Sequence, residues 1–372
     1  MTGCEDGFSP LALAVKEGNV DAVKDLVGLG ADANGPDGSG FTPIVRAVQE
    51  NHVDVIRALV ALGADVNTRN HNGTTPAFIA AMNGRADLLR VLADLGADLN
   101  TPAYSGYTPA HIAAQQGHMA SLRALGELGA DLNMPNERDG TTPAYVAASN
   151  GQVDSLRALH ELGANFNQPD DNGTTPVYIA AQQGHVASPR VLSELGADLN
   201  TPNNMGTTPA FIAAQQGHEA TIRALAELGA DLNTPNKIGT PAIIAAQQGH
   251  VASLRALGEL GADLSTPTQS GATPAHMAAW QGHVASLMAL AELGADLNIP
   301  DEDGCRPAHT AARVGLGDVV CCLVKLRVDI DTLDNYGESP LFVAVQYDHA
   351  DASVMLVNMG ADVQQCLKHS AP

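Results

Sequence analysis

The chain has 372 residues, 45% hydrophobic and 16% charged, which is enough for a buried core and excludes both a disordered tail and a membrane-spanning protein. Its 41 acidic residues outnumber the 19 basic ones, and the resulting net charge of −22 repels phosphate backbones and anionic lipids, so we expect no nucleic acid partner and no membrane insertion. Residues 1–18 lack a basic start followed by a long apolar stretch, which predicts an intracellular, cytoplasmic protein without a signal peptide.

The five cysteines do not form a recognisable framework. Cys305, Cys321, Cys322 and Cys366 lie in the last quarter of the chain and Cys4 lies far away. This spacing fits neither a disulfide scaffold nor a paired C-x-x-C metal site, so we expect reduced thiols.

A Thr-Pro or Ser-Pro pair recurs along the whole chain, with arginine before the proline in one copy. The prolines are Pro10, Pro43, Pro76, Pro109, Pro143, Pro176, Pro209, Pro241, Pro274, Pro307 and Pro340. Their spacing is 33 residues except for one interval of 34 and one of 32. Such a fixed period predicts an array of stacked supersecondary units.

Residues 105–135 show how one unit is expected to fold. Thr108 can cap a helix that begins at Pro109 and ends at Gly117, which can adopt the left-handed conformation. A second helix carries apolar residues at helical spacing from Met119 and ends at Gly129. An extended leg and a glycine-containing turn then lead to the next unit.

Two helices of about ten residues cannot bury their apolar faces alone, so the units should stack into a solenoid with one continuous core. We expect a single domain over residues 4–366 and a short tail over 367–372. The eleven expected repeats are 4–36, 37–69, 70–102, 103–135, 136–169, 170–202, 203–234, 235–267, 268–300, 301–333 and 334–366. Pro189 stands where other repeats have leucine, which predicts a weaker sixth repeat.

The consensus "GxTPxHxAAxxGHxxxLxxLxxxGADLN" resembles the ankyrin repeat, and the resemblance covers eleven copies. It implies an all-α fold, in which helix-turn-helix units with short β-hairpin fingers stack into a curved, elongated array. It also implies a binding module, because ankyrin arrays generally bind proteins with their finger tips and the concave surface of their first helices.

Three sets of polar residues recur at equivalent positions of the repeats and could be mistaken for catalytic or metal-binding residues. Histidines recur in the turn between the helices, but neighbours about 10 Å apart cannot easily share a metal ion, so we expect each to hydrogen-bond within its own turn. Aspartates of the "GAD" segment should serve turns, since equivalent positions in successive repeats do not converge on one substrate atom. Arginine and glutamate recur at i,i+4 in the second helix and should form weak surface pairs. We expect no enzyme activity, no cofactor and no metal site.

The two residues after "AA" in each first helix face the groove in the ankyrin family. Several repeats have glutamine first in this pair, at Gln115, Gln182, Gln215 and Gln247, and a ladder of amides between repeats is one alternative for them. The later repeats have Trp280, Arg313 and Tyr347 in this pair, and these three residue types dominate binding energy at interfaces. We therefore expect the centre of a binding groove in repeats nine to eleven. Trp280 either lies exposed in this groove or packs back onto the helices.

Aromatic residues at expected exposed finger turns add to the candidate site: Phe41, Tyr104, Tyr107 and Tyr336. The leading prediction is a monomeric, non-catalytic scaffold or adaptor that binds a protein partner with a basic surface. One alternative is a regulatory inhibitor subunit that occludes an enzyme or transcription factor. Another is a targeting module or a fragment of a larger protein.

Overall fold

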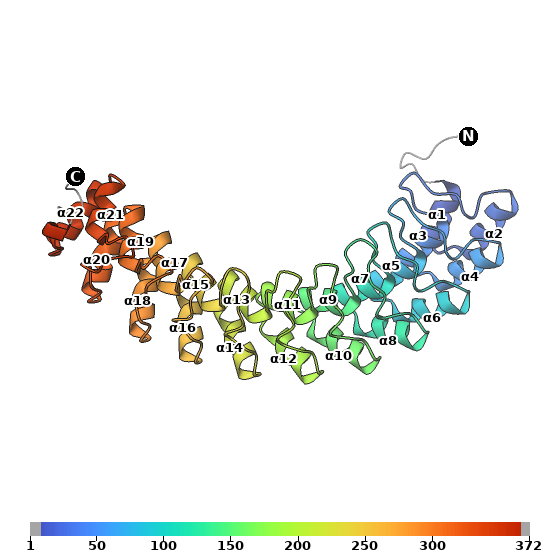
Figure 1. Ribbon diagram of the computed structural model, residues 1–372. Coiled ribbons are helices and arrows are strands. Elements are labelled where there is room, and N and C mark those ends of the chain that lie inside the picture. The colour runs from blue at the N-terminus through green and yellow to red at the C-terminus, as the bar shows by residue number, and fades with distance from the viewer. Residues whose placement is uncertain (1–8, 366–372) are drawn as a thin grey trace. The chain divides into compact units, whose positions relative to one another are not determined.

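The structure is a computed structural model that describes residues 9–365, in which the helices alternate as first and second helices of eleven pairs (Figure 1). The first helices are α1 (Pro10–Lys16), α3 (Pro43–Gln49), α5 (Pro76–Met82), α7 (Pro109–Gln116), α9 (Pro143–Ser149), α11 (Pro176–Gln182), α13 (Pro209–Gln216), α15 (Pro241–Gln248), α17 (Pro274–Gln281), α19 (Pro307–Val314) and α21 (Pro340–Gln346). The second helices are α2 (Val20–Gly28), α4 (Val53–Ala61), α6 (Ala86–Asp94), α8 (Met119–Glu127), α10 (Val153–Glu161), α12 (Ala187–Glu194), α14 (Glu219–Glu227), α16 (Val251–Glu259), α18 (Val284–Glu292), α20 (Gly317–Lys325) and α22 (Ala350–Asn358).

The α-solenoid is confirmed, whereas the expected β-hairpins do not form strands within residues 9–365. Each finger is instead a tight turn, such as the one in which Gly73 N–H bonds to Asn70 O over 2.9 Å. The chain divides into two compact units, one comprising residues up to 180 with 191–197 and the other 181–190 with 198 onward. Residues 4–8 and 366 of the expected domain and its tail at 367–372 lie outside the described residues.

The fourth repeat confirms the expected signals at the helix ends. The Thr108 side chain accepts the His111 N–H, Pro109 occupies the first helical position, and Gly117 ends α7 with φ of +77°. A left-handed residue closes the last turn of a helix, and glycine adopts this conformation without a Cβ clash. The sequence from threonine to glycine thus sets both limits of the first helix.

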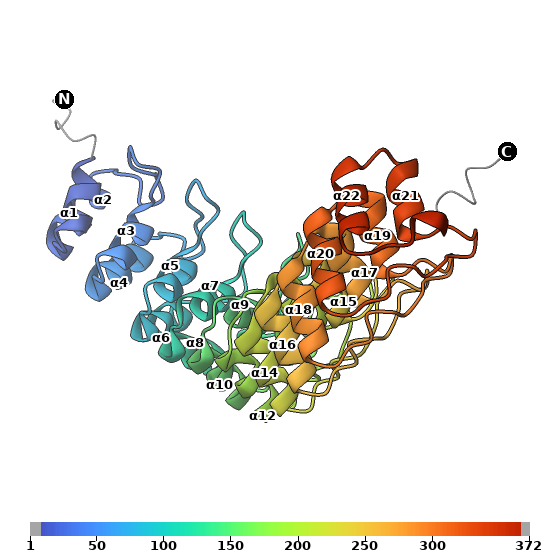
Figure 2. The ribbon, with the colours of Figure 1, turned by 90° about the vertical axis from the view of Figure 1, so that its left-hand side faces the viewer.

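Within each unit the first helices form one row and the second helices another, and the fingers project beyond the first-helix row (Figures 1 and 2). In the first unit α7 packs against α5 and α9, while α8 packs against α6 and α10. Ala113 and Ala114 of α7 and Leu122 and Leu125 of α8 are completely buried. Alanine lets neighbouring first helices approach closely, and leucine fills the space between the rows.

The turn histidines do not bond within their own turn, so that prediction is wrong. His118 Nε2 donates to Met82 O in the preceding repeat over 3.0 Å, and His52, His218, His250, His283 and His349 make the equivalent bond. The His118 ring lies over Gly84, where a Cβ would come within 2.9 Å of Nδ1. Glycine in one turn and histidine in the next are therefore one contact between repeats.

The arginine and glutamate columns also join different repeats instead of forming the expected i,i+4 pairs. Arg123 Nη2 lies 2.7 Å from Glu161 Oε2 on the next second helix. The same pairing occurs for Arg90–Glu127, Arg157–Glu194, Arg190–Glu227, Arg223–Glu259 and Arg255–Glu292. These side chains are about half exposed, so each pair contributes roughly 0–1 kcal/mol.

A third contact runs along the extended legs. Asp98 Oδ1 accepts the Asn100 N–H, as predicted for a turn aspartate, and Asn100 Oδ1 accepts the Asp131 N–H of the next repeat over 2.8 Å. The aspartate thus shapes the leg, and the asparagine ties it to its neighbour. These aspartates thus bond to the backbone of the legs.

Pro189 lies in α12, which begins at Ala187. In the fourth repeat the equivalent Leu122 N–H bonds to His118 O, and a proline cannot make this bond. The helix accordingly starts one residue later than α8 and α10 start in their repeats.

Three histidines are buried at the start of a first helix: His111, His276 and His309. His111 Nδ1 accepts the Thr108 N–H, and its Nε2 donates to Thr141 O in the next finger over 2.9 Å. Both bonds require a neutral ring protonated on Nε2. Burial, the largest cause, lowers the pKa of all three below its ordinary value.

We expect stability to fall in acid through these three histidines. Because their pKa is lower in the folded state, the unfolded chain binds more protons below about pH 6.5, and the free energy of unfolding should decrease as pH falls from there. Urea unfolding across this range measures the slope. Phe78 and Phe211 occupy the same repeat position, so replacing the three histidines by phenylalanine should flatten the slope, and an unchanged slope would contradict this explanation.

A column of buried hydroxyls runs through the second helices of the central repeats. Ser121, Ser155, Ser188, Thr221, Ser253 and Ser286 are buried, and their side-chain oxygens have no hydrogen-bond partner. Outer repeats have buried apolar residues here, including Val55, Leu88 and Val319. A buried polar atom without a partner opposes folding.

Ser253→Ala should raise the free energy of unfolding by about 1 kcal/mol, because it removes a buried hydroxyl without a partner and leaves little empty space. Ser339→Ala is the matched control, since Ser339 Oγ accepts the Phe342 N–H at a helix start and its loss should cost about 1 kcal/mol. Chemical denaturation of both variants measures the two signs. A loss of stability in Ser253→Ala would refute the prediction.

Candidate protein-binding site

Trp280 in α17 stands beside a cavity of about 320 Å³ in the second unit. Its exposed fraction is 51%, so the helices do not cover it and the alternative of complete packing does not apply. The lining includes Gln247, Met277, Trp280, Asp301, Thr310 and Arg313. Three residues expected in the groove, Gln247, Trp280 and Arg313, therefore come together from three successive first helices.

Arg313 also lines the cavity and is only partly exposed. Its Nη2 donates to Cys305 Sγ over 3.2 Å, and its Nε is buried without a hydrogen-bond partner. Burial raises the pKa of Cys305 to about 11, so the sulfur is a neutral thiol near pH 7. The guanidinium thus meets a weak acceptor and forms no ion pair among the described residues, while the Asp301 carboxylate borders the same cavity and Asp334 Oδ2 lies 3.8 Å from Cys305 Sγ.

Sequence reasoning missed Asp301, Thr310 and Met277 as part of this site. Asp301 lies in the finger that follows Trp280, and its Oδ1 accepts the N–H groups of Asp303 and Cys305. Thr310 comes one helical turn before Arg313 on the same face. The signal that could have revealed them is their position next to a groove residue, either in the same first helix or in the following repeat.

Among the remaining groove candidates, Tyr347, Gln115, Gln182 and Gln215 lie apart from the cavity lining. Tyr347 is 53% exposed and stacks on His349 with ring centroids 6.4 Å apart. Gln115, Gln182, Gln215 and Gln247 offer their backbone carbonyls to the turn residue of the next repeat. Across residues 9–365 no hydrogen bond joins glutamine side chains of adjacent repeats, so the amide ladder does not form.

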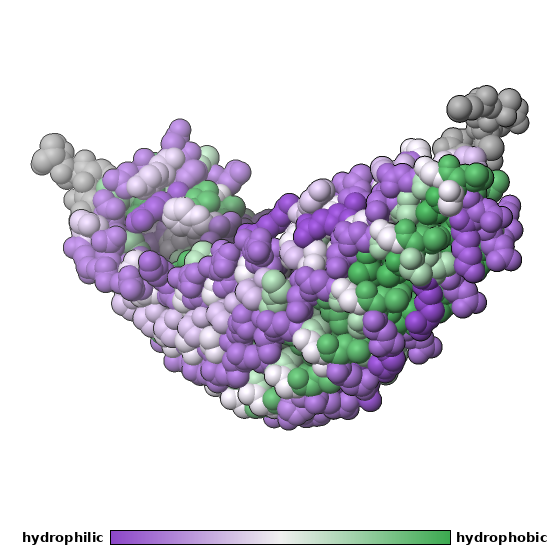
Figure 3. Space-filling view, turned by 90° about the vertical axis from the view of Figure 1, so that its right-hand side faces the viewer, coloured by the Kyte–Doolittle hydropathy of each residue, from purple (hydrophilic) through white to green (hydrophobic). Residues whose placement is uncertain are grey.

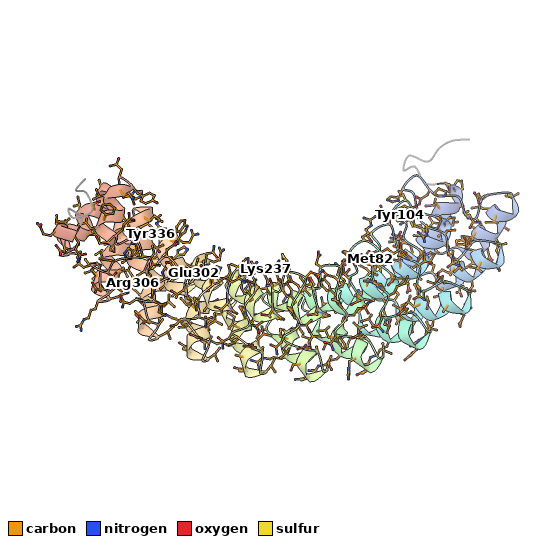
Figure 4. All side chains as sticks on the ribbon, in the orientation of Figure 1. Met82, Tyr104, Lys237, Glu302, Arg306 and Tyr336 are labelled. Carbon is orange, nitrogen blue, oxygen red and sulfur yellow. The ribbon has the colours of Figure 1, made fainter. Side chains whose placement is uncertain are left out.

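Two of the four finger aromatics are less exposed than expected. Phe41 packs under the Arg46 guanidinium, 4.9 Å from its ring centroid, and Tyr107 stacks on His111 at 5.2 Å. Tyr104 and Tyr336 are exposed by 58% and 68%. Figure 4 shows Tyr336 on a finger of the second unit and Tyr104 on a finger of the first.

The cavity lies at the contact between repeats nine and ten, which we call the 9/10 joint. Leu316 replaces the turn histidine, so no side chain bonds to the Trp280 carbonyl from that position. Met288 and Lys325 replace the arginine and glutamate of the second helices. The leg contact from Asp329 N to Asn298 Oδ1 is 3.4 Å, against 2.8 Å between Asp231 N and Asn200 Oδ1.

The finger side of the 9/10 joint keeps its contacts. His276 Nε2 donates to Cys305 O over 2.9 Å, and Glu302 N–H bonds to Ser270 O. Trp280 and Arg313 therefore lie on opposite sides of the 9/10 joint. Hydrogen bonds link the fingers of its two repeats, but the hydrogen bond from the turn histidine is missing.

Leu316→His should restore the bond to the Trp280 carbonyl and slow amide hydrogen exchange in α19 and α20 by about twofold to tenfold. Gly282, like Gly249 beneath His283, leaves room for the ring. Exchange followed by mass spectrometry measures the effect, with Leu316→Ala as the control that removes packing without adding a bond. Unchanged or faster exchange in Leu316→His would show that the missing bond does not weaken this joint.

Residues 9–365 lack two other kinds of site. No group of three or more histidine, cysteine, aspartate or glutamate residues is placed there to hold a metal ion. None of the helices in this range has the length and apolar character needed to cross a membrane.

Comparison with known proteins agrees with this architecture. The family model described as "Ankyrin repeats (3 copies)" matches residues 2–70, 62–136, 128–203, 144–236, 235–301 and 275–365. The chain is similar to the ankyrin repeat domain of Bcl-3, described as a unique member of the IkappaB protein family, with 30% sequence identity, a TM-score of 0.54, and coverage of 59% of this chain and 99% of that one. No curated protein sequence matches. The chain belongs to the ankyrin repeat family.

Proposed function

We propose that this chain is a non-catalytic, monomeric scaffold or adaptor that binds a protein partner through the groove beside its first helices and its finger tips. Repeats nine to eleven supply the energetic centre. The family assignment supports a protein-interaction role, and the polar columns of the described repeats serve contacts between repeats. The proposal places the protein in the cytoplasm.

Trp280 is the observation that carries this proposal. It is the chain's one tryptophan, it is half exposed, and it borders a cavity large enough for a side chain. Tryptophan and arginine are enriched among residues that dominate interface energies, especially beside a pocket that excludes water. About half of the indole remains open to solvent, so its burial within the fold is incomplete.

The charge of the chain supports a partner with a basic surface. Hydrophilic residues cover much of the face shown in Figure 3, with hydrophobic residues gathered in a band. A net charge of −22 attracts basic proteins and repels acidic ones over roughly 8–10 Å at physiological ionic strength. This attraction should accelerate encounter more than it adds to final affinity.

A regulatory subunit that occludes an enzyme or transcription factor is the second candidate. The structural similarity to an ankyrin repeat domain from the IkappaB family favours it. Both candidates use the same groove. Affinity capture followed by mass spectrometry identifies the partner. The activity of that partner with and without this chain then distinguishes the two candidates, because inhibition is required by the second and not by the first.

Trp280→Ala should weaken binding of the captured partner by about 2 kcal/mol or more, which is roughly thirtyfold, because the indole supplies buried contact area in the complex. Isothermal titration measures the affinity, and circular dichroism checks the fold. Gln215→Ala, at the same repeat position two repeats earlier, is the matched control and should change the affinity little. Unchanged affinity in a folded Trp280→Ala variant would refute the proposed binding centre.

A further inference from the structure

We propose that the cavity beside Trp280 receives a segment in which an apolar side chain stands next to a carboxylate, with the apolar group against Trp280 and the carboxylate on Arg313. This inference rests on the proposed function and specifies the partner chemistry of the same site. It concerns one acidic residue in the partner, not the partner's overall charge.

Arg313 has unmet hydrogen-bonding capacity. A guanidinium carries five N–H donors, and here Nη2 reaches a neutral thiol while the buried Nε has no partner. No carboxylate lies within ion-pair distance of Arg313 in the described residues. A partly buried cation in this state gains more from a carboxylate than one already paired.

Other arginines show how this chain usually satisfies the group. Arg46 lies 2.6 Å from Asp37, and Arg223 bonds both Glu219 and Glu259. Asp301 borders the same cavity as Arg313, but its Oδ1 is occupied by two backbone N–H groups of its own finger. The cavity therefore contains an arginine that forms no ion pair among the described residues and a carboxylate, Asp301, whose Oδ1 accepts two backbone N–H groups.

The apolar half of the proposed ligand is inferred from the apolar residues that line the cavity. Trp280, Met277 and Ala272 present an indole ring, a thioether and a methyl group to the cavity. A volume of about 320 Å³ has room for one large side chain with its neighbouring carboxylate. Trp280 and Arg313 come from adjacent first helices, so a two-residue ligand would bridge the 9/10 joint.

The net negative charge of the chain does not contradict a carboxylate in the ligand. The net charge of −22 acts on the whole partner, whereas Arg313 acts on one group at contact distance. Bidentate pairing between a guanidinium and a carboxylate is short-ranged and depends on geometry. A partner can thus be basic overall and still insert an acidic residue here.

The test uses three capped peptides that differ at one residue: acetyl-Gly-Phe-Glu-Gly-amide and its Gln and Lys counterparts. Trp280 fluorescence in the full chain reports binding, because no other tryptophan contributes. We expect the Glu peptide to bind about tenfold more tightly than the Gln peptide and the Lys peptide to bind more weakly than both. Arg313→Gln should remove the preference, and Arg313→Lys should keep part of it.

Arg255→Gln is the matched control, since it makes the same charge change on the second-helix surface and should leave the preference intact. Equal binding of the three peptides, stronger binding of the Lys peptide, absence of any response, or a preference that survives Arg313→Gln would each overturn the inference. These results leave the proposed function standing if the captured partner still depends on Trp280. If that dependence is absent, the proposed function itself fails.

Discussion

The structure depends on one constraint: a pair of helices this short cannot bury its own apolar faces. Leu122 and Leu125 are completely buried in α8 only because neighbouring helices lie on both sides of them. Every repeat must therefore present matching surfaces to the repeat before and the repeat after it. This requirement explains why alanine, leucine, the turn glycine and the turn histidine recur with the period of the chain, while the groove position is free to change.

Contacts between repeats fall into two classes with different consequences. Apolar packing joins neighbouring helices such as α7 with α5 and α9, whereas the polar contacts between repeats vary from joint to joint. At the 9/10 joint, Leu316 and Met288 replace tying residues while the fingers stay linked through His276. The same joint holds the cavity between Trp280 and Arg313, where an incoming side chain would contact both repeats. The missing polar contacts between repeats and the proposed binding residues, Trp280 and Arg313, thus coincide at the 9/10 joint.

The fold could be predicted from the sequence because its signals are local and repeated. Thr108, Pro109 and Gly117 set the limits of α7 through their own backbone preferences. The polar contacts could not be predicted in detail. A period of 33 residues shows that the histidine recurs, but it does not show whether His118 bonds within its own turn or to the preceding repeat. The structure assigns it to the preceding repeat, where Gly84 makes room. The arginine and glutamate partners were misassigned for the same reason: spacing along one helix says nothing about the neighbouring helix.

Only those residues of the candidate site that share one repeat position could be predicted from the sequence. Comparing one position across repeats singled out Trp280 and Arg313, but it could not show that Asp301, Thr310 and Met277 surround the same cavity, because those residues occupy different repeat positions. Nor could it show that Arg313 has a thiol where Arg46 has a carboxylate. That difference arises from the three-dimensional neighbourhood of a single residue. It also bears on the proposed chemistry of the site, since an arginine that forms no ion pair is available to a ligand carboxylate, whereas a paired one is part of the framework.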